Sequence, residues 1–306
     1  MSKFVLQPED GSVDFGNTRG DDSVDLQVVR NNATEVASGY ASFLIGGKAN
    51  TASGTYSAAF GANNVASGTG SLAIGQNNGA VGNYSLVGGL NSQSIGLSSA
   101  SLGYECFANG PFSAIAFSSQ STTDIGATYG YVAGGDSGNA YLYGQNVISG
   151  GRFASQGDAQ TSVMVARRSA SMVSTSTTTL SLDGTGTTNL IIPKGNNRSW
   201  AVSVSWNAVV TAITGTATGV TIGDTKGSTD FLVLAKRGGV TSVSNHTSVA
   251  TRVIETSGGS LTAVNITYTA GASQQLAITL TAPTFSGGGS VAMRVVAKVE
   301  LTEVAY

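Results

Sequence analysis

The chain has 306 residues, a formal net charge of −2 and only 10% charged residues, where ordinary soluble domains have about 25%. This balance provides no basic surface for nucleic acid and no attraction to an anionic membrane. The 42 glycines and 4 prolines, the many Ser, Thr, Ala and Val residues and the lack of a helical apolar period predict an all-β chain.

Residues 1–30 are predicted to form an N-terminal leader, with one weakly alternating stretch at 24–30 that favours a strand. The leader lacks the apolar core of a secretory signal. No apolar run in the sequence is as long as a membrane span. We therefore expect a protein that is made in the cytoplasm, is not secreted by a signal peptide and does not insert into a membrane.

Residues 31–121 repeat a motif of about fourteen residues, A-S-G-x-x-S-x-x-x-G, six times. Three columns stay in register: a first glycine, a serine three residues later and a second glycine seven residues after the first. Only the sixth copy breaks the last column, where Phe117 stands. A strict short period predicts a solenoid in which each copy is one rung. The first glycines are Gly39, Gly54, Gly68, Gly82, Gly96 and Gly110.

Small and apolar residues alternate after the serine, as in Leu72-Ala73-Ile74, which predicts a short strand with side chains on both faces. The glycines mark sharp turns, so each rung is predicted to hold two strands and two turns. Six rungs at ~4.8 Å give a roll roughly 30 Å long. Such a roll has little interior, so its outer apolar columns predict burial against another copy of the chain.

The copy at 66–75, ASGTGSLAIG, resembles the head repeat of trimeric autotransporter adhesins of the YadA type. The resemblance implies a left-handed parallel β-roll that assembles as a homotrimer, and it covers under a third of the chain. The sequence departs from a complete adhesin because it lacks a signal peptide, a heptad stalk and a C-terminal barrel anchor.

Residues 122–160 are rich in glycine and are predicted to form an irregular neck. The segment 151–160, GRFASQGDAQ, and the β-rich sequence after it resemble the C-terminal module of tailed-phage fibre and structural proteins. The lead-in to the roll, residues 17–39, resembles the same class of phage proteins. These resemblances imply a virion protein whose leader docks on another protein of the tail, baseplate or capsid.

Residues 161–306 are predicted to form an antiparallel β-sandwich at the tip, because about eight strand-like segments alternate with polar turns. Trp200 and Trp206 fall on one face of a predicted strand together with Val202 and Val204. We therefore expect both tryptophans to lie in a core and not to serve as glycan-binding platforms.

The chain has one cysteine, Cys106, and one histidine, His246, in different predicted modules. One cysteine forms no disulfide within the chain, and Cys106 is expected to be a small buried residue. No Cys-His pair or His/Cys metal cluster is expected, and no G-x-S-x-G turn is present. We predict no catalytic, cofactor-binding or metal-binding residues, no cofactor and no enzymatic activity.

Paired carboxylates are the common route to glycan cleavage, but the aspartates mostly stand beside Gly, Ser or Thr, as turn residues do. A pair formed across a trimer interface stays open. The candidates are Asp124, Asp136, Asp158, Asp183, Asp224 and Asp230. We expect the neck tyrosines to pack around a threefold axis: Tyr129, Tyr131, Tyr141 and Tyr143. Loops at 242–249 and 286–289 are positioned to present a receptor site, although no receptor-binding residue is assigned.

Together these features predict a homotrimeric structural fibre or spike of a tailed phage, with the roll as shaft and the sandwich as tip. Its function would be attachment to a glycan or protein receptor on the host cell, through the C-terminal module. The alternatives are a bacterial trimeric surface adhesin fragment, a virion component without receptor contact, and a depolymerising tailspike. The receptor and the host do not follow from the sequence.

Overall fold

The computed structural model describes residues 17–192, 194–244, 247–248, 252–254, 260–271 and 275–305. The chain divides into two compact units, one of Met1–Tyr141 with Asn146–Gly157 and one of Leu142–Gln145 with Asp158–Tyr306. The described residues are nearly all β, apart from a 3-10 turn at Ser260–Ala263. No helix among them is long and apolar enough to span a membrane. The predicted all-β class is confirmed.

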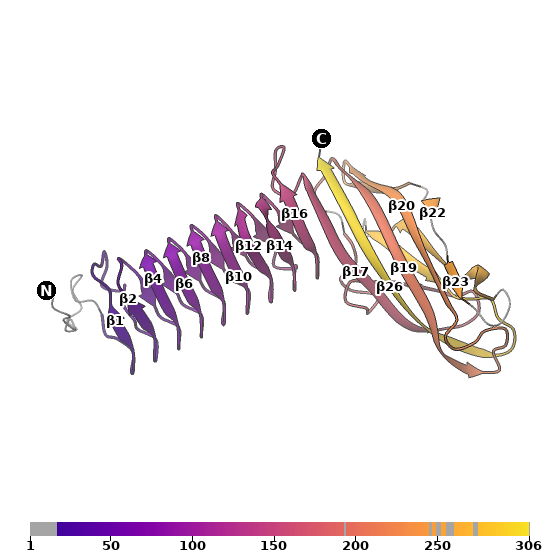
Figure 1. Cartoon of the computed structure of the whole chain (residues 1–306), viewed down its shortest axis with the longest axis horizontal. Coiled ribbons are helices and arrows are strands. Elements are labelled where there is room, and N and C mark those ends of the chain that lie inside the picture. The colour runs from indigo at the N-terminus through magenta and orange to yellow at the C-terminus, as the bar shows by residue number, and fades with distance from the viewer. Residues whose placement is uncertain are drawn as a thin grey trace. The chain divides into compact units, whose positions relative to one another are not determined.

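The first unit is a parallel β-solenoid of about eight turns, in which strands of successive rungs lie side by side (Figure 1). The strands form a larger and a smaller parallel sheet, and equivalent residues pair about fourteen positions apart, as Ala73 does with Val87. The larger sheet contains β1 (Val24–Leu26), β2 (Phe43–Ile45), β4 (Ala58–Ala62), β6 (Leu72–Gln76), β8 (Leu86–Leu90), β10 (Ala100–Tyr104), β12 (Ala114–Ser119), β14 (Tyr131–Asp136) and β16 (Asn146–Gly150).

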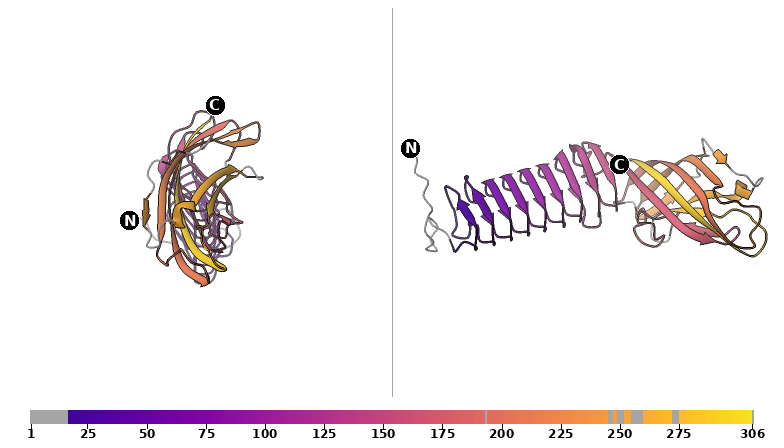
Figure 2. Two further views of the ribbon diagram at one scale, coloured as in Figure 1. Left: turned by 90° about the vertical axis from the view of Figure 1, so that its right-hand side faces the viewer. Right: turned by 60° about the horizontal axis from the view of Figure 1, so that its bottom comes forward.

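Strands of the smaller sheet alternate in sequence with strands of the larger sheet. The chain of each rung therefore passes from one sheet to the other and back, and successive rungs stack along the solenoid (Figure 2). Its strands are β3 (Thr51–Ala52), β5 (Val65–Ala66), β7 (Gly79–Ala80), β9 (Gln93–Ser94), β11 (Phe107–Ala108), β13 (Thr122–Thr123) and β15 (Asn139–Ala140). Two strands and two turns per rung confirm the prediction from the alternating residues and the glycine columns.

The interior of the solenoid is a narrow stack of small side chains. The larger sheet contributes Leu44, Ala59, Ala73, Val87, Ser101, Ile115, Val132 and Val147, all at most 1% exposed. Successive rungs approach so closely that a Cβ atom on Gly54 would lie 2.1 Å from the carbonyl oxygen of Gly68. The first-glycine column therefore exists because the backbone of the next rung occupies the place of a side chain.

A ladder of buried asparagine side chains ties the rungs together from inside. The amide Nδ2 of Asn64 donates to the carbonyl oxygens of Phe60 at 2.8 Å and Gly75 at 2.7 Å. Its Oδ1 accepts the backbone N–H of Asn78 at 3.0 Å. One rung away on either side, Asn50 and Asn78 likewise donate to a glycine carbonyl oxygen and accept a backbone N–H from the next rung. Each side chain thus satisfies backbone groups that the turn leaves without partners.

Cys106 continues this column two rungs after Asn78, because the hydroxyl of Ser92 accepts the N–H of Cys106 at 3.1 Å. The Cys106 thiol donates to the carbonyl oxygen of Ser118 at 3.2 Å. The side chain is fully buried, as predicted, and burial raises the pKa of the thiol. The cysteine therefore occupies a hydrogen-bonding position as well as a packing position.

Phe117 does not replace the second glycine of the sixth copy. The register between β10 and β12 shifts after Leu102, so that Gly103 pairs with Ser118. Phe117 is the extra residue of a β-bulge, with a positive φ of 49° and a side chain that is 86% exposed. The predicted place of Phe117 in the second-glycine column is therefore wrong, because spacing alone does not distinguish a one-residue insertion from a substitution.

The prediction of an irregular neck at 122–160 is wrong for most of that segment, since β13, β14, β15 and β16 continue the two sheets. The solenoid likewise begins inside the predicted leader, where β1 pairs with β2. In these rungs the buried columns persist, as Val132 and Val147 show, but the A-S-G motif is lost. Packing of the solenoid interior requires only that the inward-facing residues be small or apolar. The solenoid therefore continues to β16, although the A-S-G motif ends earlier in the sequence. The domain boundaries themselves stay a prediction.

The second unit contains two antiparallel sheets. One has the order β17 (Gln160–Met172), β26 (Gly289–Ala305), β19 (Arg198–Gly215), β20 (Thr225–Arg237) and β21 (Val240–Val243), and β20 also pairs with β22 (Thr247–Ser248) and β23 (Arg252–Ile254). The other has the order β18 (Thr177–Thr179), β25 (Leu276–Thr281) and β24 (Asn265–Ala270).

Trp200 and Trp206 of β19 are 0% and 4% exposed, respectively, which confirms that both belong to a core. Asp230 of β20 is buried beside Trp206 and joins the two sheets. Its Oδ2 accepts the indole N–H of Trp206 at 2.9 Å and the hydroxyl of Tyr268, on β24, at 2.5 Å. Its Oδ1 accepts the Ser228 hydroxyl at 2.8 Å. Asp230 is thus a structural acceptor in a strand and not the turn residue that its neighbours in sequence favoured.

We predict that Asn64→Ala destabilises the solenoid by about 3 kcal/mol, because the carbonyl of Gly75 and the N–H of Asn78 lose their buried partner. Denaturant unfolding followed by circular dichroism measures the change. The matched control is Asn63→Gly at the adjacent exposed position, where φ is 56° and a change within about 0.5 kcal/mol is expected. Equal effects of the two variants would contradict the role of the buried ladder.

A second prediction concerns how the stability of the second unit depends on pH. Burial opposes ionisation of Asp230, but the hydrogen bonds from Tyr268, Ser228 and Trp206 outweigh it and hold the pKa below its usual value. The carboxylate therefore contributes stability above its unfolded pKa of about 3.9, and this contribution is lost as the pH falls through the folded pKa. Thermal unfolding between pH 7 and pH 2 should show that loss in the parent chain.

Asp230→Asn should lower the melting temperature at pH 7 and flatten the acid dependence of the second unit. Glu300→Gln is the control, because Glu300 is 40% exposed and forms a surface pair with Lys298 at 2.9 Å. An acid transition that is unchanged in Asp230→Asn would contradict the assignment.

Candidate binding surfaces

Each rung of the solenoid turns twice through left-handed backbone, and the two turns form two exposed corners. We call the turn after each larger-sheet strand the asparagine corner. Its column has φ between 49° and 57° and consists of Ala49, Asn63, Asn77, Asn91, Glu105, Gln120 and Ser137. Asparagine tolerates this conformation better than other side chains, so the backbone itself explains the three asparagines.

The exposed asparagine side chains form a second ladder on the outside of the solenoid. Asn63 Nδ2 donates to Asn77 Oδ1 at 3.0 Å, and Asn77 Nδ2 donates to Asn91 Oδ1 at 3.0 Å. A hollow of about 460 Å³ lies beside the ladder. Its lining includes Asn63, Val65, Asn77, Gly79, Val81, Asn91, Gln93 and Phe107.

A second hollow of about 480 Å³ follows along the same corner and shares Asn91 and Phe107 with the first. We call the two together the solenoid groove. The lining of the second hollow is Asn91, Glu105, Phe107, Gln120, Thr122, Arg152 and Gln156. Side-chain amides dominate the groove, and each amide both donates and accepts hydrogen bonds.

Glu105 and Arg152 bring opposite charges to this end of the groove. The Glu105 carboxylate accepts the amide N–H of Gln120 at 2.8 Å. This bond, a bond from Tyr104 and the charge of Arg152 lower the Glu105 pKa, so the group is ionised at neutral pH. A surface with amides, one carboxylate, one guanidinium and an aromatic ring matches the hydroxyl groups and apolar faces of a saccharide.

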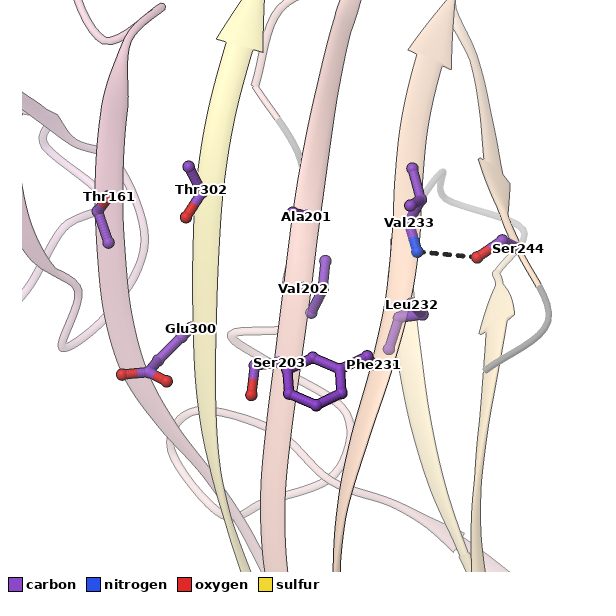
Figure 3. Close-up of a pocket in the computed structure, with 10 residues that line it drawn as sticks. All are labelled: Thr161, Ala201, Val202, Ser203, Phe231, Leu232, Val233, Ser244, Glu300 and Thr302. Atoms are coloured by element: carbon purple, nitrogen blue, oxygen red, sulfur yellow. Dashed lines mark hydrogen bonds between the residues drawn. The ribbon is translucent and has the colours of Figure 1, made fainter. Parts of the chain in front are cut away.

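The second unit has a hollow of about 650 Å³ on the open face of its larger sheet (Figure 3). Phe231 and Val233 of β20, each 48% exposed, line it together with Glu300 of β26, and Ser203 of β19 lies between Phe231 and Glu300. The Ser244 hydroxyl at its margin accepts the N–H of Val233 at 2.8 Å. The floor is a row of strand residues that contributes mainly apolar contacts, so this hollow is less suited to polar recognition than the solenoid groove.

The carboxylates considered for glycan cleavage serve other purposes where the structure describes their contacts. Asp183 accepts hydroxyl bonds from Ser181 and Thr185 in a turn. Asp224 accepts the backbone N–H of Thr221 at 2.8 Å in another turn. Asp158 is fully buried. Among the described residues no group of three or more His, Cys, Asp or Glu side chains is placed to hold a metal ion.

The remaining predicted positions are only partly placed. His246 lies outside the described residues, as does part of the loop at 242–249. In the loop at 286–289, backbone bonds join Ser286 to Thr218 and Gly288 to Thr216. Tyr129 and Tyr131 are 52% and 37% exposed. Their packing around a threefold axis stays a prediction.

The glycine and serine columns of the repeat do not predict the groove. Aligning the copies at fourteen residues also aligns Asn63, Asn77 and Asn91, so the signal was present. Arg152 and Gln156 carried no such signal, because they come from a segment that follows the last solenoid strand and returns to earlier rungs.

The family model of the YadA head domain repeat matches residues 47–64, 52–78 and 66–92. No curated protein matches the sequence. Similar solved structures include the tailspike protein of Acinetobacter baumannii phage AM24, with 11% identity and a TM-score of 0.30, covering 87% of this chain and 54% of that one. The Acinetobacter phage vB_ApiP_P1 tailspike has 11% identity and a TM-score of 0.26, covering 87% of this chain and 51% of that one.

A third structure is tailspike protein gp49 of Acinetobacter baumannii bacteriophage Fri1, described as a capsular polysaccharide depolymerase. It has 11% identity and a TM-score of 0.22, covering 92% of this chain and 46% of that one. This chain thus spans about half the length of each of the three tailspikes. The depolymerase contradicts the prediction that the chain is not an enzyme, and that prediction is withdrawn. TM-scores this low do not transfer the activity of that protein to this chain.

The family match covers the rungs in which the glycine column and the buried asparagine ladder are most regular. The predicted resemblance to YadA head repeats is therefore confirmed, and residues 47–92 of the solenoid match repeats of the YadA head type.

Proposed function

We propose that the chain is a fibre or spike of a bacterial virus that attaches the particle to a saccharide on the host cell surface. The observation that supports this most is the solenoid groove on a rigid stack of YadA-type rungs. The groove offers amide, carboxylate, guanidinium and aromatic contacts, and a ladder of buried hydrogen bonds holds its rungs in register. In this proposal the protein is part of the virion.

We further propose that three copies associate through the outer face of the larger solenoid sheet. Ile45 and Ile74 of that face are 44% and 43% exposed, and the rings of Phe43 and Phe60 contact each other at 5.8 Å between centroids. An apolar row of this kind along a whole sheet favours burial against an identical row, which closed symmetry supplies. Three copies would present three grooves, so weak contacts would add through avidity.

The location of the receptor contact divides the proposal into two versions. The first places it in the C-terminal unit, as the sequence predicted, and the second places it in the solenoid groove. The described residues favour the groove, because its lining includes side-chain amides and a guanidinium, whereas the polar side chains of the hollow in Figure 3 are hydroxyls and one carboxylate. The leader would dock on another virion protein, and most of its residues lie outside the described part of the chain.

A bacterial surface adhesin fragment is the second candidate function, and the YadA head repeats favour it. A virion component without receptor contact is the third. The genes that flank the coding sequence separate the first two, because tail genes indicate a virion protein and secretion genes indicate an adhesin.

We predict that Ile74→Glu disrupts the trimer, because it would place three charges in an apolar interface. Size-exclusion chromatography with light scattering should give about three times the chain mass for the parent and the single-chain mass for the variant. Ile95→Glu is the control, since Ile95 follows a smaller-sheet strand and is 45% exposed. A parent protein that elutes as a monomer would refute the proposed trimer.

We predict that the purified full-length chain blocks adsorption of its phage to host cells and that Asn91→Gly with Arg152→Ala weakens this block at least tenfold. Plaque counts of unadsorbed phage measure the effect. Asn265→Ala with Arg294→Ala removes the same residue types from exposed strand positions of the second unit and should leave the block unchanged. A block that survives the groove variant would move the contact to the C-terminal unit, and no block by the parent would support a purely structural role.

A further inference from the structure

The second exposed corner of the solenoid, the turn before each larger-sheet strand, carries aromatic side chains. We call it the aromatic corner. Its left-handed column has φ between 48° and 62° and consists of Asp22, Ala41, Tyr56, Gly70, Tyr84, Ser98, Phe112, Tyr129 and Gly144. Tyr56, Tyr84 and Phe112 are 63%, 65% and 46% exposed.

These rings stand where the backbone disfavours them. A bulky side chain in left-handed backbone is an outlier, and the same column holds glycine at Gly70 and Gly144. The asparagine corner has the same left-handed backbone, but there several positions are occupied by asparagine, which tolerates a positive φ. Because the three rings are exposed, burial in a core does not compensate for the strain. Strained, exposed residues of this kind are characteristic of binding sites.

The rings also lie in an ordered row. Phe112 stacks on Tyr129 with 5.4 Å between centroids and 19° between planes. The Tyr84 ring leans along the corner towards the preceding rung, since a Cβ atom on Gly70 would lie 3.0 Å from Tyr84 Cδ1. Tyr40 and Tyr56 contact edge to face at 5.6 Å. The aromatic corner therefore carries one pair of contacting rings at each end, with the exposed Tyr84 ring between the two pairs.

The distance between the rings along the solenoid indicates the repeat length of the ligand. Tyr56, Tyr84 and Phe112 recur every twenty-eight residues, which is two rungs or ~10 Å along the solenoid. In a β-1,4-linked chain of hexopyranoses each sugar is turned over relative to the one before it, so the same face recurs at every second sugar. The length of that disaccharide unit is close to two rungs.

We infer that the aromatic corner binds a β-1,4-linked hexopyranose chain lying along the solenoid, with every second sugar stacked on Tyr56, Tyr84 and Phe112. Thr55 and Asn83, next to these rings in the turns, supply hydrogen-bonding groups for the sugar hydroxyls. The acidic pair Asp21 and Asp22 in the first rung disfavours an anionic chain at that end. This inference goes beyond the proposed function, because it assigns a second surface and a linkage class.

Isothermal titration of the full-length protein with cellohexaose and chitohexaose tests the inference, with α-linked maltohexaose as the comparison. At least one β-1,4-linked hexamer should bind, the matching trimer should bind more weakly, and maltohexaose should not bind. The triple variant Tyr56→Asn, Tyr84→Asn, Phe112→Asn should lose binding, with a loss of about tenfold for each ring removed singly.

The substitutions to asparagine keep the fold testable, because asparagine suits the left-handed backbone better than the rings it replaces. The triple variant should therefore melt no lower than the parent. Phe117→Asn is the matched control, since Phe117 is also exposed and left-handed but lies in the bulge of β12, outside the aromatic corner. It should leave oligosaccharide binding unchanged.

Failure of both β-1,4-linked hexamers to bind the parent, or equal binding by the triple variant, would overturn the inference. A triple variant that binds normally but changes its mass in light scattering would instead assign the aromatic corner to contacts between copies of the chain. None of these outcomes alters the adsorption result for the solenoid groove, because that experiment changes different residues.

Discussion

The close approach of successive rungs is the constraint on which the rest of the solenoid depends. A carbonyl oxygen of the next rung lies about where a side chain would begin at Gly54, Gly68 and Gly82. Such spacing leaves room for only small buried residues and forces each rung to turn sharply. The buried asparagines supply hydrogen bonds to turn backbone that would otherwise lack partners in a dry interior. The first rung adds an ion-paired cluster, in which Asp25 contacts Arg19 at 3.3 Å and Arg30 at 2.9 Å.

The close approach of the rungs also limits which surfaces of the solenoid can carry ligand-binding residues. The interior is too narrow for anything but packing, and the outer face of the larger sheet is apolar. The two corners are left as polar or aromatic surfaces whose residues repeat with the rungs. A ligand that itself repeats, such as a polysaccharide, gains from such a surface because each added unit meets an equivalent contact.

The second unit is stabilised in a different way. Its sheets are joined by a buried carboxylate that accepts bonds from an indole, a phenol and a serine hydroxyl. Removing one member of such a network leaves the others without partners, so the network favours one arrangement of the two sheets. The candidate carboxylates of this unit are therefore mostly explained by structure, and surface recognition depends on loops that lie partly outside the described residues.

The sequence alone determined the all-β class, the rung length, the YadA-type repeat and the burial of Trp200, Trp206 and Cys106, because these follow from local periodicity and from alternation along strands. Tertiary structure decided the rest. Only strand pairing revealed that Phe117 is inserted, that the rungs continue to β16 and that Arg152 returns to the groove, since each depends on contacts between distant residues. The two corners differ for the same reason: spacing predicts a turn, but only the backbone conformation shows that asparagine suits it and that tyrosine does not.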